Sequence, residues 1–363
     1  MWIVGFLLLL GPLVTLHELG HYLVGRWFGV KADVFSVGFG KELAGWTDRR
    51  GTRWRLAALP LGGYVQFAGD MNPASQPSED WLNLPEAERA RTFQAKPLWQ
   101  RALIVAAGPV TNFLIAIVIL AGFNLAYGKA VVPPLVGSVI EGGAAYEAGI
   151  RPGDRIVEMD GIAVESFGQL ANRVVIDPGG RIELVVERDG DRVGYELAIP
   201  TLIERDRFGN EFRKGQLGIG SVEGEFVPVG PAESVTLAVD QTGEIIVTMV
   251  TGVWQIITGR RPIDELGGPI KIAKFSGEQL SLGWDNFIWF VAMISINLAF
   301  INLLPIPALD GGHLAFYAAE AVRRKPVGPR SQEWAFRTGI AFVLALMLFV
   351  TVNDIASLPI FGN

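Results

Sequence analysis

The sequence predicts a multi-pass α-helical membrane protein with four transmembrane helices, a membrane-associated β-hairpin region and an inserted α+β domain outside the membrane. Three observations predict this class. Half of the 363 residues are hydrophobic and only 19% are charged, whereas a soluble domain is about a quarter charged. Four stretches contain almost no Lys, Arg, Asp or Glu. The net charge of the segments between them also changes sign along the chain.

Composition excludes several classes of site and partner. The chain has no Cys, which excludes a disulfide scaffold, thiolate metal sites and cysteine catalysis. Its 31 basic and 37 acidic residues leave a net charge of −6. A nucleic-acid partner is therefore not expected, because proteins of that class present a strongly basic surface.

The uncharged stretches define the predicted membrane spans. Residues 102–128 give 27 consecutive uncharged positions and residues 286–309 give 24, whereas about 20 apolar residues suffice to cross a bilayer as a helix. The first stretch is not expected to be a cleaved signal peptide, since no basic residue precedes Arg26. The four helices are placed at about 2–28, 102–127, 285–304 and 336–353.

The charge of the segments between the spans predicts their orientation. Residues 26–101 and residues 318–337 each carry a net charge of +3, whereas residues 129–283 carry −8. Basic residues close to span ends stay on the cytoplasmic side of a membrane. We therefore expect the acidic segment and both termini on the opposite, extracytoplasmic side.

A short motif in the first span predicts a metal centre. Residues 17–21 read His17-Glu18-Leu19-Gly20-His21, and two of the three histidines of the chain lie in it. Histidines four positions apart share one helix face and can bind one Zn²⁺, and the Glu between them can take a proton from a zinc-bound water. The alternative is a chance match or a polar packing cluster. It is disfavoured, because ionisable side chains in a membrane span are costly and usually functional.

A proline-rich string near the end of the third span offers the third ligand that zinc needs. It begins at Asn302, reads Leu-Leu-Pro-Ile-Pro-Ala-Leu, and continues with Asp310-Gly-Gly-His313. Its two prolines cannot continue a helix, so they should open the span near its cytoplasmic end and turn Asp310 toward the two histidines. His313 is the rival ligand, and its alternative role is that of a polar residue starting the next helix.

These two motifs resemble those of the site-2 protease family, which cuts peptide bonds within membranes using zinc. The resemblance covers nearly the whole chain and is closest to the bacterial regulator of sigma-E protease (RseP) type. It implies that His17, His21 and Asp310 bind zinc, that Glu18 is the catalytic base and that Asn302 helps to hold substrate. Further matches are Gly38-Phe39-Gly40, Pro60-Leu61-Gly62-Gly63-Tyr64, Gly108-Pro109 and Gly268-Pro269-Ile270.

The segment after the first span alternates apolar and polar residues between glycines over residues 31–70, which is typical of short strands. The resemblance implies a β-hairpin that dips into the membrane, contains Gly38, Phe39 and Gly40, and pairs its edge with an unwound substrate. Strand addition grips an extended peptide without reading its sequence. A cytoplasmic sheet that only caps the helices is the alternative. Residues 71–95 are expected to form a surface linker or a short amphipathic helix.

The acidic segment carries turn signals around an apolar run, Pro152-Gly153-Asp154 before it and Asp160-Gly161 after it. The string resembles a bacterial, circularly permuted PDZ domain over residues 129–226, and the chain has room for one such domain. Its last strand, Leu217-Gly218-Ile219-Gly220, would offer backbone amides to a peptide C-terminus. A rigid plug that binds no peptide is the alternative.

The remaining connection has apolar residues at helical spacing over 231–260, which predicts an amphipathic helix on the outer membrane surface or against the PDZ-like domain. The predicted segments are, in order, 1–30 (first span), 31–100 (hairpin region and linker), 101–128 (second span), 129–226 (PDZ-like domain), 227–283 (helical connector), 284–309 (third span), 310–334 (ligand turn and cytoplasmic loop) and 335–363 (fourth span and tail).

The expected function is that of a zinc-dependent intramembrane endopeptidase in the inner membrane of a bacterium. The resemblance implies single-span transmembrane substrates, such as an anti-sigma factor or signal-peptide remnants, in contact with the lipid bilayer. An inactive membrane adaptor with a peptide-binding PDZ domain is the first alternative, and the intact Glu18 argues against it. A metal transporter is the second. It is disfavoured by the small number of spans and the lack of an inverted repeat.

Overall fold

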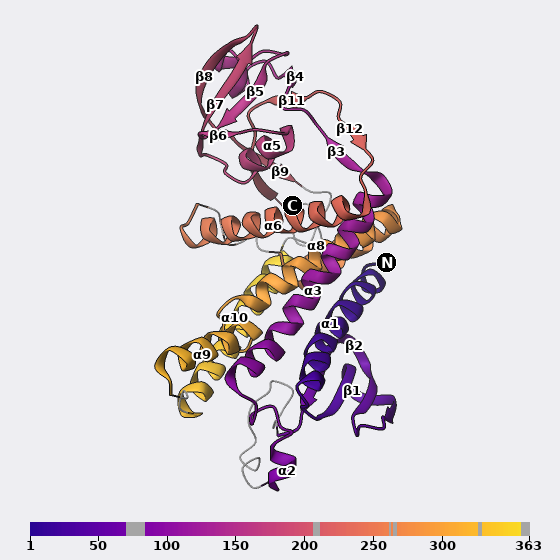
Figure 1. Ribbon diagram of the computed structural model, residues 1–363. Coiled ribbons are helices and arrows are strands. Elements are labelled where there is room, and N and C mark those ends of the chain that lie inside the picture. Colours follow the sequence, from indigo (N-terminus) through magenta and orange to yellow (C-terminus); the bar gives the residue numbers. More distant parts are fainter. Residues whose placement is uncertain (70–83, 206–210, 261–262, 264–266, 326–328, 357–363) are drawn as a thin grey trace. The chain divides into compact units, whose positions relative to one another are not determined.

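The computed structural model of the chain describes residues 1–69, 84–205, 211–260, 263, 267–325 and 329–356. The chain divides into two compact units (Figure 1). The first unit comprises Met1–Leu120 and Gly267–Asp354, and the second comprises Ala121–Leu266 and Ile355–Asn363.

In the described part of the chain, four long apolar helices lie where the four spans were predicted. Each is long and apolar enough to cross a bilayer, and they are α1 (Trp2–Trp27), α3 (Leu98–Tyr127), α8 (Trp284–Leu303) and α10 (Pro329–Ala356). α3 begins at Leu98, earlier than the predicted start at 102, because a charged residue does not by itself end a helix. Arg101 continues the helix, and its guanidinium lies 3.2 Å from the carboxylate of Glu320.

Glycines let neighbouring backbones approach α1 closely. A Cβ at Gly20 would lie 2.3 Å from Thr111 Oγ1 and 2.6 Å from the Ala107 carbonyl oxygen, both on α3. A Cβ at Gly5 would lie 2.7 Å from the backbone of Ser276. Small residues at helix contacts are typical of membrane bundles, in which close packing replaces water exclusion as the driving force.

The predicted strands after α1 are confirmed as one long antiparallel hairpin, formed by β1 (Ala32–Thr47) and β2 (Arg53–Phe67). The hairpin folds over on itself. Residues 34–37 pair with 63–66 on one side and with 53–56 on the other, and 44–47 pair with the far side of 53–56. Two strands in the chain therefore make a layer four strands wide, with residues 63–66 at one edge.

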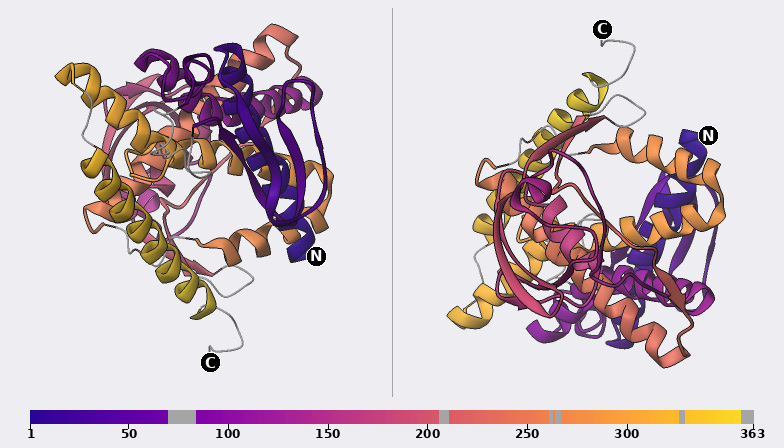
Figure 2. Two further views of the ribbon diagram at one scale, coloured as in Figure 1. Left: turned by 90° about the horizontal axis from the view of Figure 1, so that it is seen from below. Right: turned by 90° about the horizontal axis from the view of Figure 1, so that it is seen from above.

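The bend in this hairpin depends on Gly38. Its φ is +91°, and a Cβ there would lie 2.7 Å from the Leu59 carbonyl oxygen, so only glycine fits without strain. The layer lies along α1 (Figures 1 and 2), where Tyr22, Phe35 and Val65 belong to one buried cluster. The packing brings the edge strand of the hairpin beside the motif on α1.

Three shorter helices complete the described part of the first unit: α2 (Glu86–Arg89), α7 (Pro269–Leu282) and α9 (Asp310–Arg323). Most of the predicted linker over 71–95 lies outside the described residues, which resume at position 84. The start of α7 is capped by Asp354 of α10, a buried carboxylate that accepts the backbone N–H groups of Gly268, Ile270 and Lys271. A helix start leaves such donors free, so this cap joins α7 to α10.

The second unit is built on a four-stranded antiparallel sheet in the order β6–β5–β7–β8, with three further strand pairs, β4–β11, β3–β12 and β9–β10. Its strands are β3 (Lys129–Val131), β4 (Val136–Val139), β5 (Arg155–Met159), β6 (Ile162–Ala163), β7 (Arg181–Arg188), β8 (Asp191–Ala198), β9 (Thr201–Arg205), β10 (Glu211–Gly215), β11 (Ile219–Ser221) and β12 (Glu225–Val227). Its helices are α4 (Ala144–Ala148), α5 (Phe167–Val175) and α6 (Pro231–Ile257).

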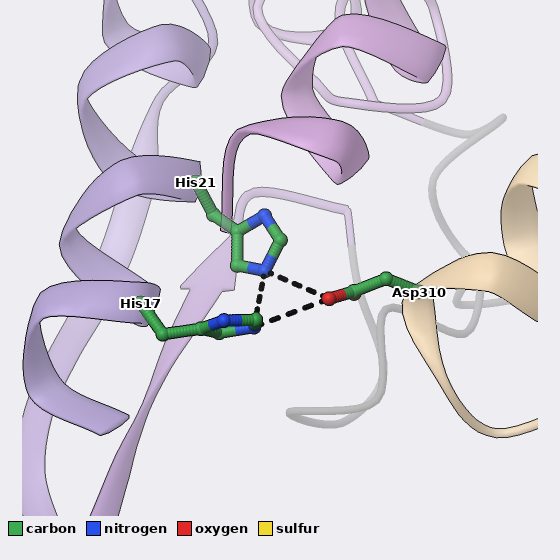
Figure 3. Close-up of side chains that lie close together, drawn as sticks. All are labelled: His17, His21 and Asp310. Carbon is green, nitrogen blue, oxygen red and sulfur yellow. Dashed lines mark hydrogen bonds and ion pairs between the residues drawn. The ribbon is translucent and has the colours of Figure 1, made fainter. Parts of the chain in front are cut away.

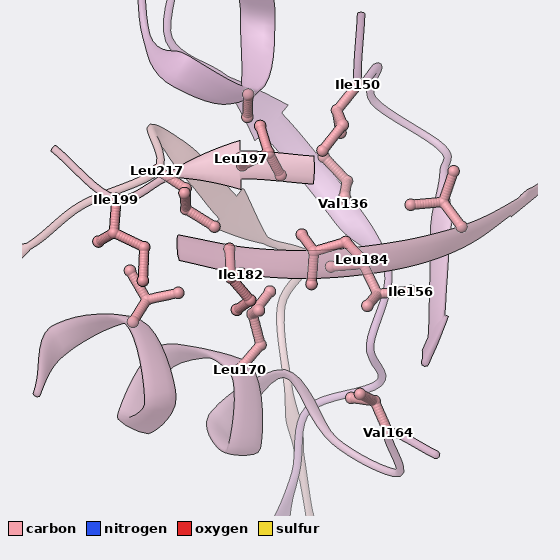
Figure 4. Close-up of a cluster of buried hydrophobic side chains, with 13 residues drawn as sticks. Val136, Ile150, Ile156, Val164, Leu170, Ile182, Leu184, Leu197, Ile199 and Leu217 are labelled. Carbon is pink, nitrogen blue, oxygen red and sulfur yellow. The ribbon is translucent and has the colours of Figure 1, made fainter. Parts of the chain in front are cut away.

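The core of this unit follows from the alternation along β7. Ile182, Leu184 and Val186 point inward and are buried, while the residues between them face outward. They meet Leu170 from α5 and Leu217 from the segment before β11 in a single cluster (Figure 4). The second unit therefore has a hydrophobic core of its own.

A buried ion pair holds the Pro-Gly-Asp turn that precedes β5. Arg188 Nε and Nη2 each donate to the carboxylate of Asp154 at 2.7 Å, and Asp154 is almost fully buried. Burial alone would raise the pKa of Asp154, but the Arg188 hydrogen bonds outweigh it and hold this pKa below its ordinary value. The carboxylate is therefore ionised at neutral pH and fixes the turn.

The predicted amphipathic helix over 231–260 is confirmed as α6. It buries a small and polar face, with Ser234, Ala238 and Thr242, and exposes large apolar residues, among them Val239 and Trp254. A helix in water shows the reverse arrangement. Its apolar face is therefore suited to an apolar neighbour.

Candidate metal centre

α1 places two imidazoles on one face because His17 and His21 are four residues apart. Both side chains are buried, and their Nε2 atoms lie 3.2 Å from each other (Figure 3). The rings meet edge to face, with centroids 4.8 Å apart. This geometry points both Nε2 atoms at the same small volume.

Asp310 reaches that volume from the start of α9 (Figure 3). α8 ends where Leu304 adopts an extended conformation before the first proline, and Ala308 takes a positive φ of 87° just before α9 begins. Gly312 allows α9 to start against this turn, since a Cβ there would lie 2.4 Å from the Ile306 carbonyl oxygen. The predicted break of the third span thus turns Asp310 toward the histidines.

The three donors have the spacing of a zinc site. Asp310 Oδ2 lies 3.1 Å from His17 Nε2 and 3.6 Å from His21 Nε2. Tetrahedral zinc with bonds of about 2.0–2.1 Å keeps its ligand atoms roughly 3.3–3.4 Å apart. Two imidazole nitrogens and one carboxylate oxygen therefore fit the ion and leave its fourth position open.

The charge state of Asp310 is suited to binding a cation. Burial alone would raise the pKa of Asp310, but His21 and His17 facing it hold this pKa below its usual range. Asp310 is therefore a carboxylate rather than a carboxylic acid, as a zinc ligand must be.

α3 contacts both imidazoles on the side away from Asp310, which the sequence motifs do not predict. His21 Nδ1 donates to the Ile104 carbonyl oxygen at 2.8 Å, and the Asn112 side-chain amide lies 3.1 Å from His17 Nδ1. Between them, Gly108 provides room, because a Cβ there would lie 2.3 Å from His21 Nε2. A signal was present in the sequence, since Asn112 is an amide inside an uncharged span.

Glu18 lies in the same cavity, which has a volume of about 250 Å³ and is lined by all three donors. Its Oε2 accepts the backbone N–H of Val65 at 3.1 Å, so the edge strand of the hairpin holds this carboxylate in place. Asn302, on the last turn of α8, lines the cavity too. The structure therefore brings together the predicted base, the predicted ligands and one predicted substrate contact.

His313, the rival ligand, also lines the cavity but stands apart from the three donors. Its ring packs against Phe336, with centroids 4.8 Å apart. The structure thus favours Asp310 over His313 as the third ligand.

The other predicted substrate contacts lie elsewhere. Gly38, Phe39 and Gly40 belong to β1 and are not part of the cavity wall, and Phe39 stacks on Tyr64 with centroids 5.9 Å apart. In the second unit, Leu217 is buried in the core and its carbonyl oxygen accepts the Ala145 N–H.

The next two residues connect Leu217 to the pair that β11 forms with β4. Gly218 offers its carbonyl oxygen to the Ile140 N–H, and Ile219 pairs with Val139. Peptide binding by the amides of this segment stays a prediction.

Comparison with known proteins places the chain in a family. Residues 5–346 match peptidase family M50. A relative from Agrobacterium fabrum, named as a zinc metalloprotease, is 45% identical, with 98% of this chain and 96% of the relative covered. One from Rhizobium meliloti, also named as a zinc metalloprotease, is 44% identical over 96% of this chain and 95% of its own length. The metalloprotease MmpA of Caulobacter vibrioides is 36% identical over 99% and 96%. The chain therefore belongs to peptidase family M50, the site-2 proteases, and is a membrane zinc metalloprotease.

Proposed function

We propose that this protein is an endopeptidase that cuts single-span membrane proteins inside their transmembrane segments. The observation that carries the proposal is the place of the cavity. His17, His21 and Glu18 lie within α1, a helix long and apolar enough to span a bilayer. A peptide bond can reach them only at membrane depth, so the substrate is itself a membrane segment.

The residues around the cavity divide the chemistry among them. His17, His21 and Asp310 would hold zinc, which would acidify a water molecule and polarise the scissile carbonyl. Glu18 takes the proton from the attacking water and passes it to the leaving amine. Asn302 can hold the substrate backbone through its side-chain amide, because it lines the same cavity.

The hairpin edge is the proposed guide for the substrate. A transmembrane helix hides its peptide bonds in its own hydrogen bonds, so it must unwind before it can be cut. Residues 63–66 form an edge of the hairpin layer, and Val65 in that edge lines the cavity beside Glu18. An unwound segment that pairs there as an added strand would have its backbone next to the base.

Residues 129–226, which lie in the second unit, are proposed to form a PDZ domain on the extracytoplasmic side of a bacterial inner membrane. In support, its sheet and helices enclose a core of their own, and the acidic segment that forms it lies between spans whose other ends are basic. The substrates proposed are anti-sigma factors or signal-peptide remnants, whose outer parts have been trimmed.

An inactive adaptor is the second candidate, and the cavity disfavours it. A protein that only binds peptides has no need of a carboxylate held next to three metal donors, yet Glu18 is kept there by the Val65 N–H. The relatives compared above are likewise named as metalloproteases.

The proposed function is tested by mapping the cut. Purified protein and a single-span test substrate are placed in the same lipid vesicles, and the products are sized by mass spectrometry. We expect new termini within the apolar segment of the substrate and no products after zinc is removed by a chelator. Cuts found solely in the water-exposed parts of the substrate would contradict intramembrane proteolysis.

The role of the proposed PDZ domain is tested by deleting residues 130–226. Val227 and Lys129 are direct partners in the β3–β12 pair, so about 5 Å separates the two ends and a linker of a few Gly and Ser residues closes the gap. We expect the deletion to keep cleavage of a trimmed substrate and to allow cleavage of an untrimmed one, because bulky outer domains are no longer excluded. The measurement is the ratio of the two cleavage rates in both proteins. An unchanged ratio in an active deletion variant would show that the proposed PDZ domain does not gate access.

A further inference from the structure

The two histidines differ in the group that contacts Nδ1, the ring nitrogen that does not face Asp310. His21 Nδ1 faces the Ile104 carbonyl oxygen, and a carbonyl oxygen only accepts hydrogen bonds. The proton of a neutral His21 therefore lies on Nδ1, and Nε2 keeps the lone pair that a metal ligand must offer. His17 needs the same arrangement to bind zinc, and its Nδ1 faces the amide of Asn112.

The side-chain amide of Asn112 carries one donor atom, Nδ2, and one acceptor atom, Oδ1. Nδ2 of Asn112 is the atom nearest to His17 Nδ1, at 3.1 Å. The other atom, Oδ1, is buried and has no hydrogen-bond partner among the described residues. A half turn of the amide exchanges two atoms of nearly equal size and brings the unpaired Oδ1 onto His17 Nδ1.

We propose that Asn112 is a positioning residue of the metal centre: its Oδ1 accepts the Nδ1–H of His17 and so directs the Nε2 lone pair of His17 to zinc. This inference rests on the ligand set of the proposed function. In the opposite orientation the Asn112 N–H donates to Nδ1, and the proton of a neutral His17 lies on Nε2, where it blocks coordination. The amide orientation and metal binding are therefore coupled.

The surroundings hold Asn112 in register with the histidines. The hydroxyl of Ser295 on α8 donates to the backbone carbonyl oxygen of Asn112 at 2.8 Å, and both residues are fully buried. Three positions on α3 face the imidazoles at four-residue steps: the Ile104 carbonyl, the space beside Gly108 and the Asn112 amide. The two histidines on α1 have the same four-residue spacing. Each imidazole thus has its own support on the facing helix.

The experiment compares two substitutions at Asn112 in the full-length protein. Asn112→Leu keeps the size of the side chain and removes the acceptor, whereas Asn112→Asp keeps an acceptor in place of the amide. The matched control is Asn124→Leu, because Asn124 is a buried amide on the same helix whose hydrogen bonds go to Ser234 and Gln241 instead. Zinc affinity is measured by competition with a chelator, and thermal unfolding checks that each variant folds.

We expect Asn112→Leu to weaken zinc binding by roughly 10–100-fold, as the loss of such supporting contacts does in other zinc sites. Asn112→Asp and Asn124→Leu should stay close to the wild-type affinity. The proposal is wrong if Asn112→Leu binds zinc as tightly as the wild type, or if Asn112→Asp loses as much as Asn112→Leu.

A spectroscopic measurement locates the proton of His17 directly, and it does not require the Leu variant to fold. The chain has three histidines, so histidine-selective ¹⁵N labelling gives few signals. In the zinc-loaded wild type and in Asn112→Asp, His17 should carry its proton on Nδ1, in slow exchange with water. Coordination of zinc through His17 Nδ1 would overturn the proposal.

Loss of zinc in Asp310→Ala with unchanged binding in Asn112→Leu would reject the role of Asn112 alone, whereas unchanged zinc in Asp310→Ala would reject the ligand set.

Discussion

Glu18→Gln should lower the rate of peptide cleavage by roughly 10²–10⁴-fold, the usual contribution of a general base, while leaving zinc bound. Gln has the shape of Glu but cannot take up a proton from water. Its side-chain oxygen can still accept the Val65 N–H that holds Glu18, so the hairpin edge should keep its place. The measurement is the initial cleavage rate of the single-span test substrate, together with the zinc content per protein.

The matched control for this variant is Glu320→Gln. Glu320 pairs with Arg101 and does not line the cavity, so its substitution should leave both the rate and the zinc content unchanged. A wild-type rate in Glu18→Gln would remove Glu18 from the mechanism. Loss of zinc from that variant would instead assign Glu18 a part in holding the metal.

Asp310→Ala should abolish activity because zinc is lost, whereas the base Glu18 is still present. Two imidazoles alone hold zinc weakly, so we expect the affinity to fall by more than the roughly 10–100-fold that the loss of a supporting contact costs. Asp310→Asn tests charge separately from shape, because an amide is a poorer ligand than a carboxylate. Zinc content after dialysis and affinity by chelator competition check both variants.

The control for these variants is Asp33→Ala, which removes an exposed carboxylate that pairs with Lys31. It should keep full zinc occupancy. If Asp310→Ala also keeps full occupancy and normal activity, another group supplies the third ligand, and His313 is the first to examine because it lines the same cavity.

Rules that act over a few residues were sufficient to predict the helices and strands and two of the three proposed metal ligands. Long uncharged runs can only satisfy their backbone groups in a bilayer as helices, and all four became helices of spanning length. The four-residue step between His17 and His21 places both rings on one face of any helix that contains them. The alternation after the first span likewise produced strands. Each of these features depends on residues close together in the chain.

The third ligand needed more than a local rule. The prolines before Asp310 and the family resemblance point to this residue, but they do not exclude His313. Only the packing of α9 against α1 shows that the Asp310 carboxylate stands 3.1 Å from His17 Nε2. The His313 ring turns to Phe336 instead. Both side chains belong to one short helix, so the choice between them depends on how that helix docks.

The sequence by itself determined the spans, the strands and the identity of the chemical groups. The tertiary structure alone decided the folded-over hairpin that brings the Val65 N–H to Glu18. It also decided the supporting face of α3, where Ile104, Gly108 and Asn112 stand behind the imidazoles. The physical reason is the range of the interactions. Helix and strand patterns arise from neighbours within a few residues, whereas His17 and Asn112 meet only because α1 and α3 pack closely at Gly20.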